Sequence, residues 1–467
     1  MSFILYDLVF LAAFTLFVVA FLYSRRKKLK REGPLYLYKT QVGIKIIEYF
    51  GKKHAKFISY LEYVIIFVGY LLMVGSIFLI GQVVYIFVRF PEFIKIAKIP
   101  PIAPLVPYIG EIFKADYLPP FYFTYWIVVL AITAIVHEFF HGIIARKNNV
   151  RIKSTGFAFL GPFLGAFVEQ DDKQMKKLRA RNQISILAAG SFSNLLLTIL
   201  FFIILIIFSV LAFAPSGARF NYYPSSIINV SDITLISNES MILDFQFEEL
   251  NLVRIDIGNK SYFLEKEVSE NINNFTLVVG FDDAPAIRAG ILGTITELDG
   301  MKIRDNEDLK NVLFELSPGE GVSIKSIDSK NNVKESEIIL GSRPDNSSRA
   351  YLGIARVEGG SGIFGKLREG LSFFRDPDTY YAPRHLEELT IFIYNLIWWM
   401  VLINLSVALF NMLPVGIFDG GRVFYLTVFR VTKSKKIAQK AYSLMVYLFI
   451  ALFVLLTLFW VFYTFFI

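Results

Sequence analysis

Long hydrophobic runs, separated by polar and basic stretches, dominate the chain and predict its fold class. Six runs are long enough to cross about 30 Å of hydrocarbon, which takes about 20 helical residues. The pattern predicts a polytopic α-helical membrane protein of about six spans. These spans are expected at residues 2–23, 57–90, 121–145 and 184–213, and at about 389–413 and 441–467.

The first run is predicted to be a membrane anchor. Asp7 is its only charged residue, and the basic cluster at residues 25–28 follows the run. A secretory signal peptide has its basic residues before the apolar segment and a small-residue cleavage site after it. The order of the two features therefore favours an anchor over a signal peptide.

Lysine and arginine counts in the short loops predict the orientation of the spans. Residues 24–57 hold 11 of these basic residues, residues 145–183 hold 9 and residues 422–440 hold 6, whereas residues 91–120 hold only 3. Basic loops stay on the cytoplasmic side. We therefore expect both termini and the polar stretch 214–383 to be extracytoplasmic, in a multi-pass protein of the cell membrane.

The apolar stretch 156–168 is too short to span and is interrupted by Gly161, Pro162 and Gly165. Basic loops flank it on both sides, so it must enter and leave the membrane from the cytoplasmic side. A re-entrant β-hairpin is the natural prediction, and its backbone groups must pair within the protein because lipid offers no partners.

Composition excludes several classes of protein. The chain contains no cysteine, which excludes disulfide frameworks, thiolate zinc sites and cysteine nucleophiles. Its net charge of +8 sits beside apolar runs, as in a membrane protein, so we expect a lipid bilayer and no nucleic acid as its partner.

The third predicted span carries the strongest chemical signal, His137-Glu138-Phe139-Phe140-His141. Residues i and i+4 share one face of a helix, so both imidazoles can bind one metal ion while Glu138 acts on its water. A carboxylate within a span also needs a compensating partner, such as a divalent cation. The alternative is a structural hydrogen-bonded cluster within the helix bundle.

A catalytic zinc site usually has three protein ligands, and Asp419 is the candidate for the third. It lies in the segment 411–422, which follows an apolar span and is broken by Pro414 and three glycines, so that the backbone can unwind. Asp419 lies three residues before Arg422, and His141 lies five residues before Arg146. The two ligands are therefore expected at a similar, shallow depth on the cytoplasmic side.

These residues resemble the motifs of the site-2 protease family of intramembrane zinc metalloproteases. The His-Glu-x-x-His helix is followed by Gly190-x-x-x-Asn194 and then by Asn411-x-x-Pro414-x-x-x-x-Asp419-Gly420, in the family's order. The resemblance covers about residues 121–215 and 385–467.

The resemblance implies one zinc ion per chain, held by His137, His141 and Asp419, with Glu138 as the catalytic base. It further implies that Asn194 steadies the transition state or the substrate, and that Asn411 and Pro414 shape the substrate site. The stretch 156–168 resembles the family's membrane-edge hairpin, so Gly161 and Phe163 are candidate substrate-binding residues beside a captured strand.

Residues 272–342 resemble a PDZ domain of the protease-associated type. The resemblance rests on residues 282–291, 295–300 and 317–322, with strand-like runs at 322–327 and 335–340 and an amphipathic stretch at 307–316. Gly293-Thr294 departs from the usual Gly-Asp, so the domain is expected either to bind a peptide at a sheet edge or to act as a cap without a ligand. Residues 216–271 alternate apolar and polar positions and are expected to add strands.

The predicted organisation has five parts. Residues 1–120 form N-terminal spans and loops, 121–215 the first half of the protease core, 216–358 the extracytoplasmic β-rich insert, 359–384 a linker or interfacial helix, and 385–467 the second half of the core. Within the linker, residues 365–374 are expected either to lie along the membrane surface or to form a plain connecting helix.

The function expected from these features is hydrolysis of peptide bonds in or near transmembrane segments of single-pass membrane proteins, in regulated intramembrane proteolysis. Two alternatives come from other classes. Ionisable residues in broken membrane helices also occur in transporters, but we find no internal repeat in the sequence. An inactive membrane scaffold that presents the PDZ-like module is the other alternative.

Overall fold

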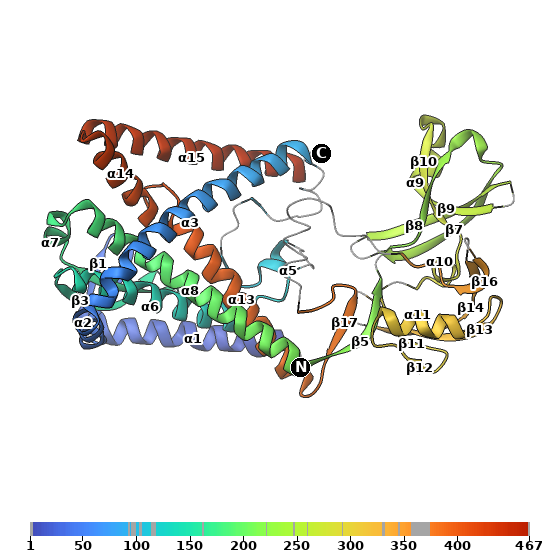
Figure 1. Ribbon diagram of the computed structural model, residues 1–467, viewed down its shortest axis with the longest axis horizontal. Coiled ribbons are helices and arrows are strands. Elements are labelled where there is room, and N and C mark those ends of the chain that lie inside the picture. Colours follow the sequence, from blue (N-terminus) through green and yellow to red (C-terminus); the bar gives the residue numbers. More distant parts are fainter. Residues whose placement is uncertain are drawn as a thin grey trace. The chain divides into compact units, whose positions relative to one another are not determined.

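The computed structural model divides into two compact units, Met1–Leu205 with Phe392–Ile467, and Ile206–Ile391 (Figure 1). The residues that it describes are 3–91, 94, 100–101, 105–113, 118–160, 163–220, 222–245, 248–258, 260–291, 293–328, 332–343, 346–355 and 374–465.

Six helices in the described part of the chain are long and apolar enough to cross a membrane, which confirms the predicted number of apolar spans. A multi-pass membrane protein follows from their length and composition. Several of them extend a few residues beyond the apolar runs into basic or polar sequence. They are α1 (Phe3–Arg25), α3 (Ala55–Arg89), α6 (Phe123–Lys147), α8 (Ala180–Ala212), α13 (Glu387–Asn411) and α15 (Lys435–Phe465).

Asp7, the one charged residue of the first span, binds the start of α6. Its side chain is 2% exposed and accepts the backbone N–H groups of Phe123 and Thr124 at 2.7 and 2.9 Å, and the hydroxyl of Tyr108 at 2.6 Å. The first N–H groups of a helix have no partner within the helix, and a carboxylate there is electrostatically favourable. Asp7 thus caps α6 from another helix and fixes α1 beside it.

Glu62 performs a similar function near the other end of α6. It is 1% exposed on α3 and accepts hydrogen bonds from Lys147 at 2.5 Å and Asn148 at 2.6 Å, at the end of α6. Ser185, near the start of α8, donates to the same carboxylate at 3.2 Å. A buried carboxylate needs such partners, and this one connects the three helices α3, α6 and α8.

A four-stranded antiparallel sheet packs against α6 in the first unit. Its order is β1 (Leu29–Glu32), β2 (Leu35–Thr40), β3 (Ile152–Leu160) and β4 (Phe163–Gln170), with β4 at the edge. The predicted hairpin at 156–168 is therefore extended, as expected, and longer at both ends. Its turn, including Gly161 and Pro162, lies outside the described residues. The sequence analysis did not predict β1 and β2, which occupy the first basic loop.

A glycine and an ion pair between two of its strands help to hold this sheet together. A Cβ on Gly156 would lie 2.0 Å from the carbonyl oxygen of Tyr38, so only glycine lets β2 and β3 approach as they do. Lys39 on β2 donates to Glu169 on β4 at 2.7 Å, across β3. This hydrogen bond, reinforced by Ser154, lowers the pKa of the Glu169 carboxyl below its ordinary value.

The basic loops of the first unit contain its short elements, which lie at one end of the helix bundle (Figure 1). The 3₁₀ turn η1 (Arg26–Lys28) and α2 (Ile44–Lys53) fall in the first basic loop, and α7 (Asp172–Lys177) in the second. The junction of α14 and α15 in the third basic loop lies at the same end. On the opposite-side loop, α5 spans Ile109–Phe113.

The chain unwinds after α13, as the glycines and Pro414 predict. Residues 412–418 form turns and bends, and α14 (Asp419–Thr432) then begins at the candidate ligand. A Cβ on Gly420 would lie 2.2 Å from the carbonyl oxygen of Met412, and one on Gly421 would lie 2.3 Å from that of Val415. The two glycines therefore let α14 start directly against the unwound segment. Helix α14 itself was not predicted.

The second unit is rich in β-structure. Its largest sheet has the order β14-β13-β11-β5-β17, with β12 paired to β11, and a buried core that includes Ile295, Leu298 and Ile324. The strands are β5 (Phe213–Phe220), β11 (Gly293–Leu298), β12 (Met301–Lys302), β13 (Gly321–Ile327), β14 (Val333–Ile339) and β17 (Thr379–Pro383), and the helices of the same region are α10 (Pro285–Arg288) and α11 (Asn306–Glu315). The strands expected near 322–327 and 335–340 are thereby confirmed, and the amphipathic stretch at 307–316 forms α11.

Residues 216–271 add strands, as predicted, and most of these belong to a second sheet of order β6-β10-β9-β8-β7. Its elements are β6 (Ser225–Asn229), η2 (Val230–Asp232), β7 (Leu235–Phe245), β8 (Glu248–Ile257), β9 (Lys260–Glu265), α9 (Lys266–Glu270), η3 (Ile272–Asn274) and β10 (Leu277–Asp282). A separate hairpin joins β15 (Gly341–Arg343) to β16 (Asn346–Tyr351). Residues 365–373 of the expected interfacial stretch lie outside the described residues.

Candidate metal centre and active site

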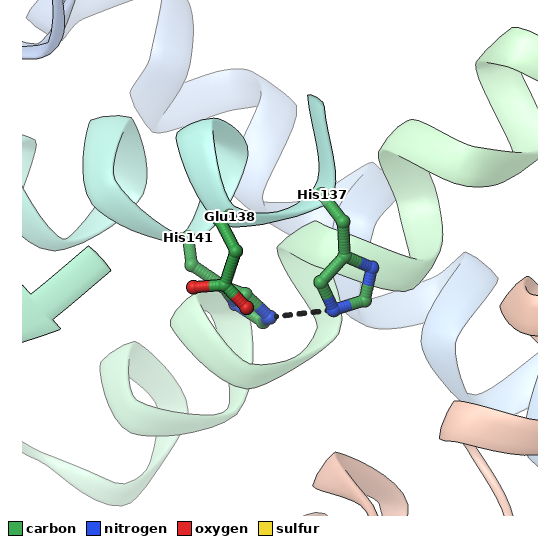
Figure 2. A group of neighbouring side chains, drawn as sticks. All are labelled: His137, Glu138 and His141. Atoms are coloured by element: carbon green, nitrogen blue, oxygen red, sulfur yellow. Dashed lines mark hydrogen bonds between the residues drawn. The ribbon is translucent and has the colours of Figure 1, made fainter. Parts of the chain in front are cut away.

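His137 and His141 lie one turn apart on α6 and point to the same place, as Figure 2 shows. Their Nε2 atoms are 3.0 Å apart, and both residues are 7% exposed. The potential ligand atoms of these two residues and of Glu138 all lie within 4.8 Å of one another. The helical spacing thus produces the shared face that the sequence predicts.

Asp419 completes this group from the start of α14. Its Oδ2 lies 3.2 Å from Nε2 of His141 and 3.7 Å from Nε2 of His137. The chain from α13 onward therefore brings a carboxylate to two imidazoles that lie almost 280 residues earlier. One carboxylate oxygen and two imidazole nitrogens converge on a single small volume.

The spacing of these three atoms fits a tetrahedral zinc ion. Ligands at about 2.0–2.2 Å in a tetrahedral arrangement are about 3.3–3.6 Å apart, and the distances here are 3.0, 3.2 and 3.7 Å. Gly190 on α8 borders the same volume. A Cβ there would lie 2.3 Å from Nε2 of His137 and 2.5 Å from Nε2 of His141, so the space beside both nitrogens exists because residue 190 has no side chain.

A hydrogen bond at Nδ1 orients the ring of each histidine, whose Nε2 faces the shared volume. Nδ1 of His141 lies 2.6 Å from the carbonyl oxygen of Ile186 and donates to it, which leaves Nε2 for a metal ion. Nδ1 of His137 lies 2.9 Å from the side-chain amide of Asn194, which is fully buried. Such outer partners are typical of metal-binding histidines, because they fix the ring and its tautomer.

Metal binding by His137 would determine which atom of the Asn194 side-chain amide faces Nδ1 of that histidine. A histidine that binds metal through Nε2 carries its hydrogen on Nδ1, so Nδ1 must donate. The Oδ1 atom of Asn194 is buried and has no hydrogen-bond partner within the described residues. A half-turn of the amide would present Oδ1 to Nδ1 of His137, giving this oxygen a partner and matching the tautomer that metal binding requires.

Glu138 lies between the Nε2 atoms of the two histidines and the sheet. Its Oε2 accepts the backbone N–H of Val168 on β4 at 2.9 Å. Gly142 on α6 packs closely between this strand and α2, since a Cβ there would lie 3.2 Å from the side chain of Val168 and 3.0 Å from that of Ile47. The edge strand thereby holds one oxygen of the carboxylate.

The structure brings together five of the predicted site residues and does not place the other four, the proposed substrate-binding residues, in the same group. His137, Glu138, His141, Asn194 and Asp419 form the group just described. Asn411 ends α13 and Pro414 is buried in the unwound segment that leads to Asp419. Gly161 and the side chain of Phe163 lie outside what the structure describes, although Phe163 begins β4.

Sequence reasoning missed the roles of Ile186, Gly190 and Val168. Ile186, Gly190 and Asn194 are spaced by four residues, so they share one face of α8 that meets both histidines. This spacing was a usable signal once α8 was expected to pack on α6. The backbone N–H of Val168 gave no signal, because every residue except proline carries one.

Residues 125–456 match peptidase family M50. No curated protein matches the sequence. The matched region contains both histidines, Gly190, Asn194 and Asp419, whereas α1, the first two strands and α3 precede it.

Proposed function

Since the chain belongs to peptidase family M50, the zinc-dependent site-2 protease family, we propose that it is an intramembrane zinc metalloprotease. It hydrolyses peptide bonds in or near transmembrane segments of single-pass membrane proteins, as a step in regulated proteolysis. The observation that carries the proposal is the convergence of two imidazoles and one carboxylate beside a glycine that leaves room for an ion.

His137, His141 and Asp419 would hold one zinc ion per chain. When bound, the ion supplies a Lewis acid that polarises a peptide carbonyl and acidifies water. Ile186 and Asn194 keep the two imidazoles oriented through Nδ1. Asn194 in addition remains our candidate for a contact with the substrate or the transition state.

Glu138 moves the proton. One carboxylate oxygen is held by the N–H of Val168, and the carboxylate stays within 4.8 Å of the imidazole nitrogens. It can take a proton from water at the site and deliver it to the leaving amine, as a general base and then a general acid.

The edge strand β4 would hold the substrate. A transmembrane helix keeps its peptide bonds within its own hydrogen-bond ladder, so it must unwind locally before attack. β4 is the last strand of its sheet, and an unwound segment can add to such an edge as a further strand. Gly161 and Phe163 remain proposed substrate contacts beside this edge, and Asn411 and Pro414 remain proposed to shape the substrate site.

The orientation follows from the basic loops. All three basic segments lie at the end of the bundle that carries α2 and α7 (Figure 1), and basic loops stay cytoplasmic. The site would then face the cytoplasm, with both termini and the β-rich unit outside. Such a position would release the cleaved fragment inward.

The β-rich unit would contribute a PDZ-like module that binds a peptide. A groove of about 280 Å³ lies along α11 and the loop that follows β16, with Leu309, Leu313 and Leu352 among its lining residues. Gly353, in that loop, has a φ of 75°. Arg349 in the same lining adds positive charge, which suits a peptide carboxylate. The module would extend past the expected residue 342 to include this loop.

The substitution Glu138→Gln tests the proteolytic role. It keeps the size of the side chain and should leave zinc bound, while cleavage of a single-pass model substrate falls at least about 100-fold. Glu388→Gln, an exposed substitution on α13, is the matched control and should cleave normally. Cleavage by Glu138→Gln at the unaltered rate would contradict the assignment.

The substitution His137→Ala tests the metal site, and elemental analysis of the purified protein should show that zinc is lost. Zinc-independent ion flux through vesicles without any cleavage would favour a transporter instead. A chain that binds zinc and cleaves no substrate would favour the inactive scaffold.

A further inference from the structure

A cavity of about 230 Å³ lies between the sheet and α6. Ile135 and Phe139 of α6 form one wall, and Phe157 and Ala166 of the hairpin form another. For comparison, a cavity of about 150 Å³ holds a benzene ring, so this one has room for a large aliphatic or aromatic side chain.

Apart from Glu138, the lining offers almost nothing to a polar ligand. The hydroxyl of Thr155 donates to the carbonyl oxygen of Val42 at 2.5 Å, and that of Thr40 to the carbonyl oxygen of Thr155 at 3.3 Å. Both hydroxyl groups are therefore already engaged within the protein. An occupant that fills this cavity without losing hydrogen bonds to water must be apolar.

Glu138 connects the cavity to the proposed chemistry. It belongs to the lining, while its carboxylate lies within 4.8 Å of the imidazole nitrogens. Consecutive Cα atoms are 3.8 Å apart. A side chain in the cavity would therefore belong to a residue next to, or one position removed from, a peptide bond held at the metal site.

The register of β4 favours an extended occupant. The N–H of Val168 points away from β3 to Glu138, and the backbone direction alternates along a strand, so the N–H of Ala166 points to the same edge. Phe157 and Ala166 pair directly across the hairpin and face the cavity together. A strand added at this edge would place alternate side chains on this face.

We infer that this cavity is a side-chain subsite that selects a bulky aliphatic or aromatic residue beside the scissile bond. The inference rests on the proposed function, and it names Ala166 and Phe157 as the residues that set the size of the accepted side chain.

The test uses the full chain in phospholipid vesicles with a single-pass substrate whose cleavage position has been mapped by mass spectrometry. Alanine, leucine, phenylalanine and tryptophan are placed in turn at each position flanking the cut. At one position, leucine or phenylalanine should exceed alanine about tenfold or more in kcat/KM, as expected for an apolar pocket.

Two variants change the cavity in opposite directions. Ala166→Leu fills it and should remove the preference for large residues, whereas Phe157→Ala enlarges it and should improve cleavage with tryptophan. Ala158→Leu is the matched control, because Ala158 pairs with Gly165 on the opposite face and does not line the cavity. It should keep the unaltered preference.

The outcomes separate the two proposals. If the unaltered chain cleaves but shows no size preference, or if both cavity variants keep its order of preference, the subsite is refuted and the protease stands. If the unaltered, zinc-containing chain cleaves nothing, the proposed function fails, and the subsite fails with it.

Discussion

Replacing Gly190 with alanine should abolish metal binding while leaving the fold intact. The new Cβ would lie 2.3 Å from Nε2 of His137 and 2.5 Å from Nε2 of His141. Ordinary contacts begin near 3.4 Å, so the two rings must move by roughly 1 Å. Metal–ligand distances tolerate only about 0.2 Å.

The expected loss is large because two effects coincide. The methyl group occupies the space beside both nitrogens, and ring movement also breaks the hydrogen bonds of Nδ1 to Ile186 and Asn194. Loss of an outer partner by itself typically costs 10–100-fold in metal affinity. Gly190→Ala should therefore weaken zinc binding by more than about 100-fold, and cleavage should fall with it.

Zinc content by elemental analysis and affinity by chelator competition measure this effect. Alanine is the better helix former by about 1 kcal/mol, so unfolding is not the expected cause, and thermal unfolding checks this. Gly81→Ala on α3 is the matched control, since a Cβ there meets nothing within 4 Å. If Gly190→Ala binds zinc as tightly as the unaltered chain, the proposed metal position is wrong.

Three further changes test other contacts. Asn194→Ala should lower zinc affinity by about 10–100-fold in a chelator competition; unchanged affinity with impaired cleavage would instead support a contact with the substrate. Asp7→Ala leaves the backbone N–H groups of Phe123 and Thr124 at the start of α6 without their carboxylate acceptor. This should lower the free energy of unfolding by about 1–3 kcal/mol, and the thermal midpoint with it. An unchanged midpoint would contradict this anchoring of α1 to α6. Because Lys39 lowers the pKa of Glu169, their pairing stabilises the sheet above the ordinary carboxyl pKa. That stability is lost as the pH falls from there through the lowered pKa. Protease sensitivity of the hairpin should rise there, and Lys39→Ala should remove this pH dependence; a dependence that survives in the variant would rule the pair out as its cause.

The spans and the histidine pair could be predicted because their signals are local. Hydrophobic runs of sufficient length predict membrane helices with little regard to the rest of the chain. The i, i+4 spacing of His137 and His141 places them on one face of any helix. The unwound segment before Asp419 followed equally from proline and glycine. Each of these features depends on residues within one or two helical turns.

Other features needed the tertiary structure, because they depend on contacts between distant segments. Asp7 was only an unexplained charge in an apolar run until its partners at the start of α6 were known. Strands β1 and β2 lie in a basic loop without a strong strand pattern. Strand β2 pairs with β3 from a distant part of the chain, and β1 in turn pairs with β2.

The arrangement around the metal centre divides in the same way. Sequence by itself determined which side chains are candidates for the chemistry, since residue type and helical spacing are properties of the chain. Only the tertiary structure decided that Gly190 borders the Nε2 atoms of both histidines, that Val168 holds Glu138 and that a largely apolar cavity adjoins the site. Steric contact and backbone hydrogen bonding between separate segments create these features, and neither depends on a residue pattern that the sequence displays.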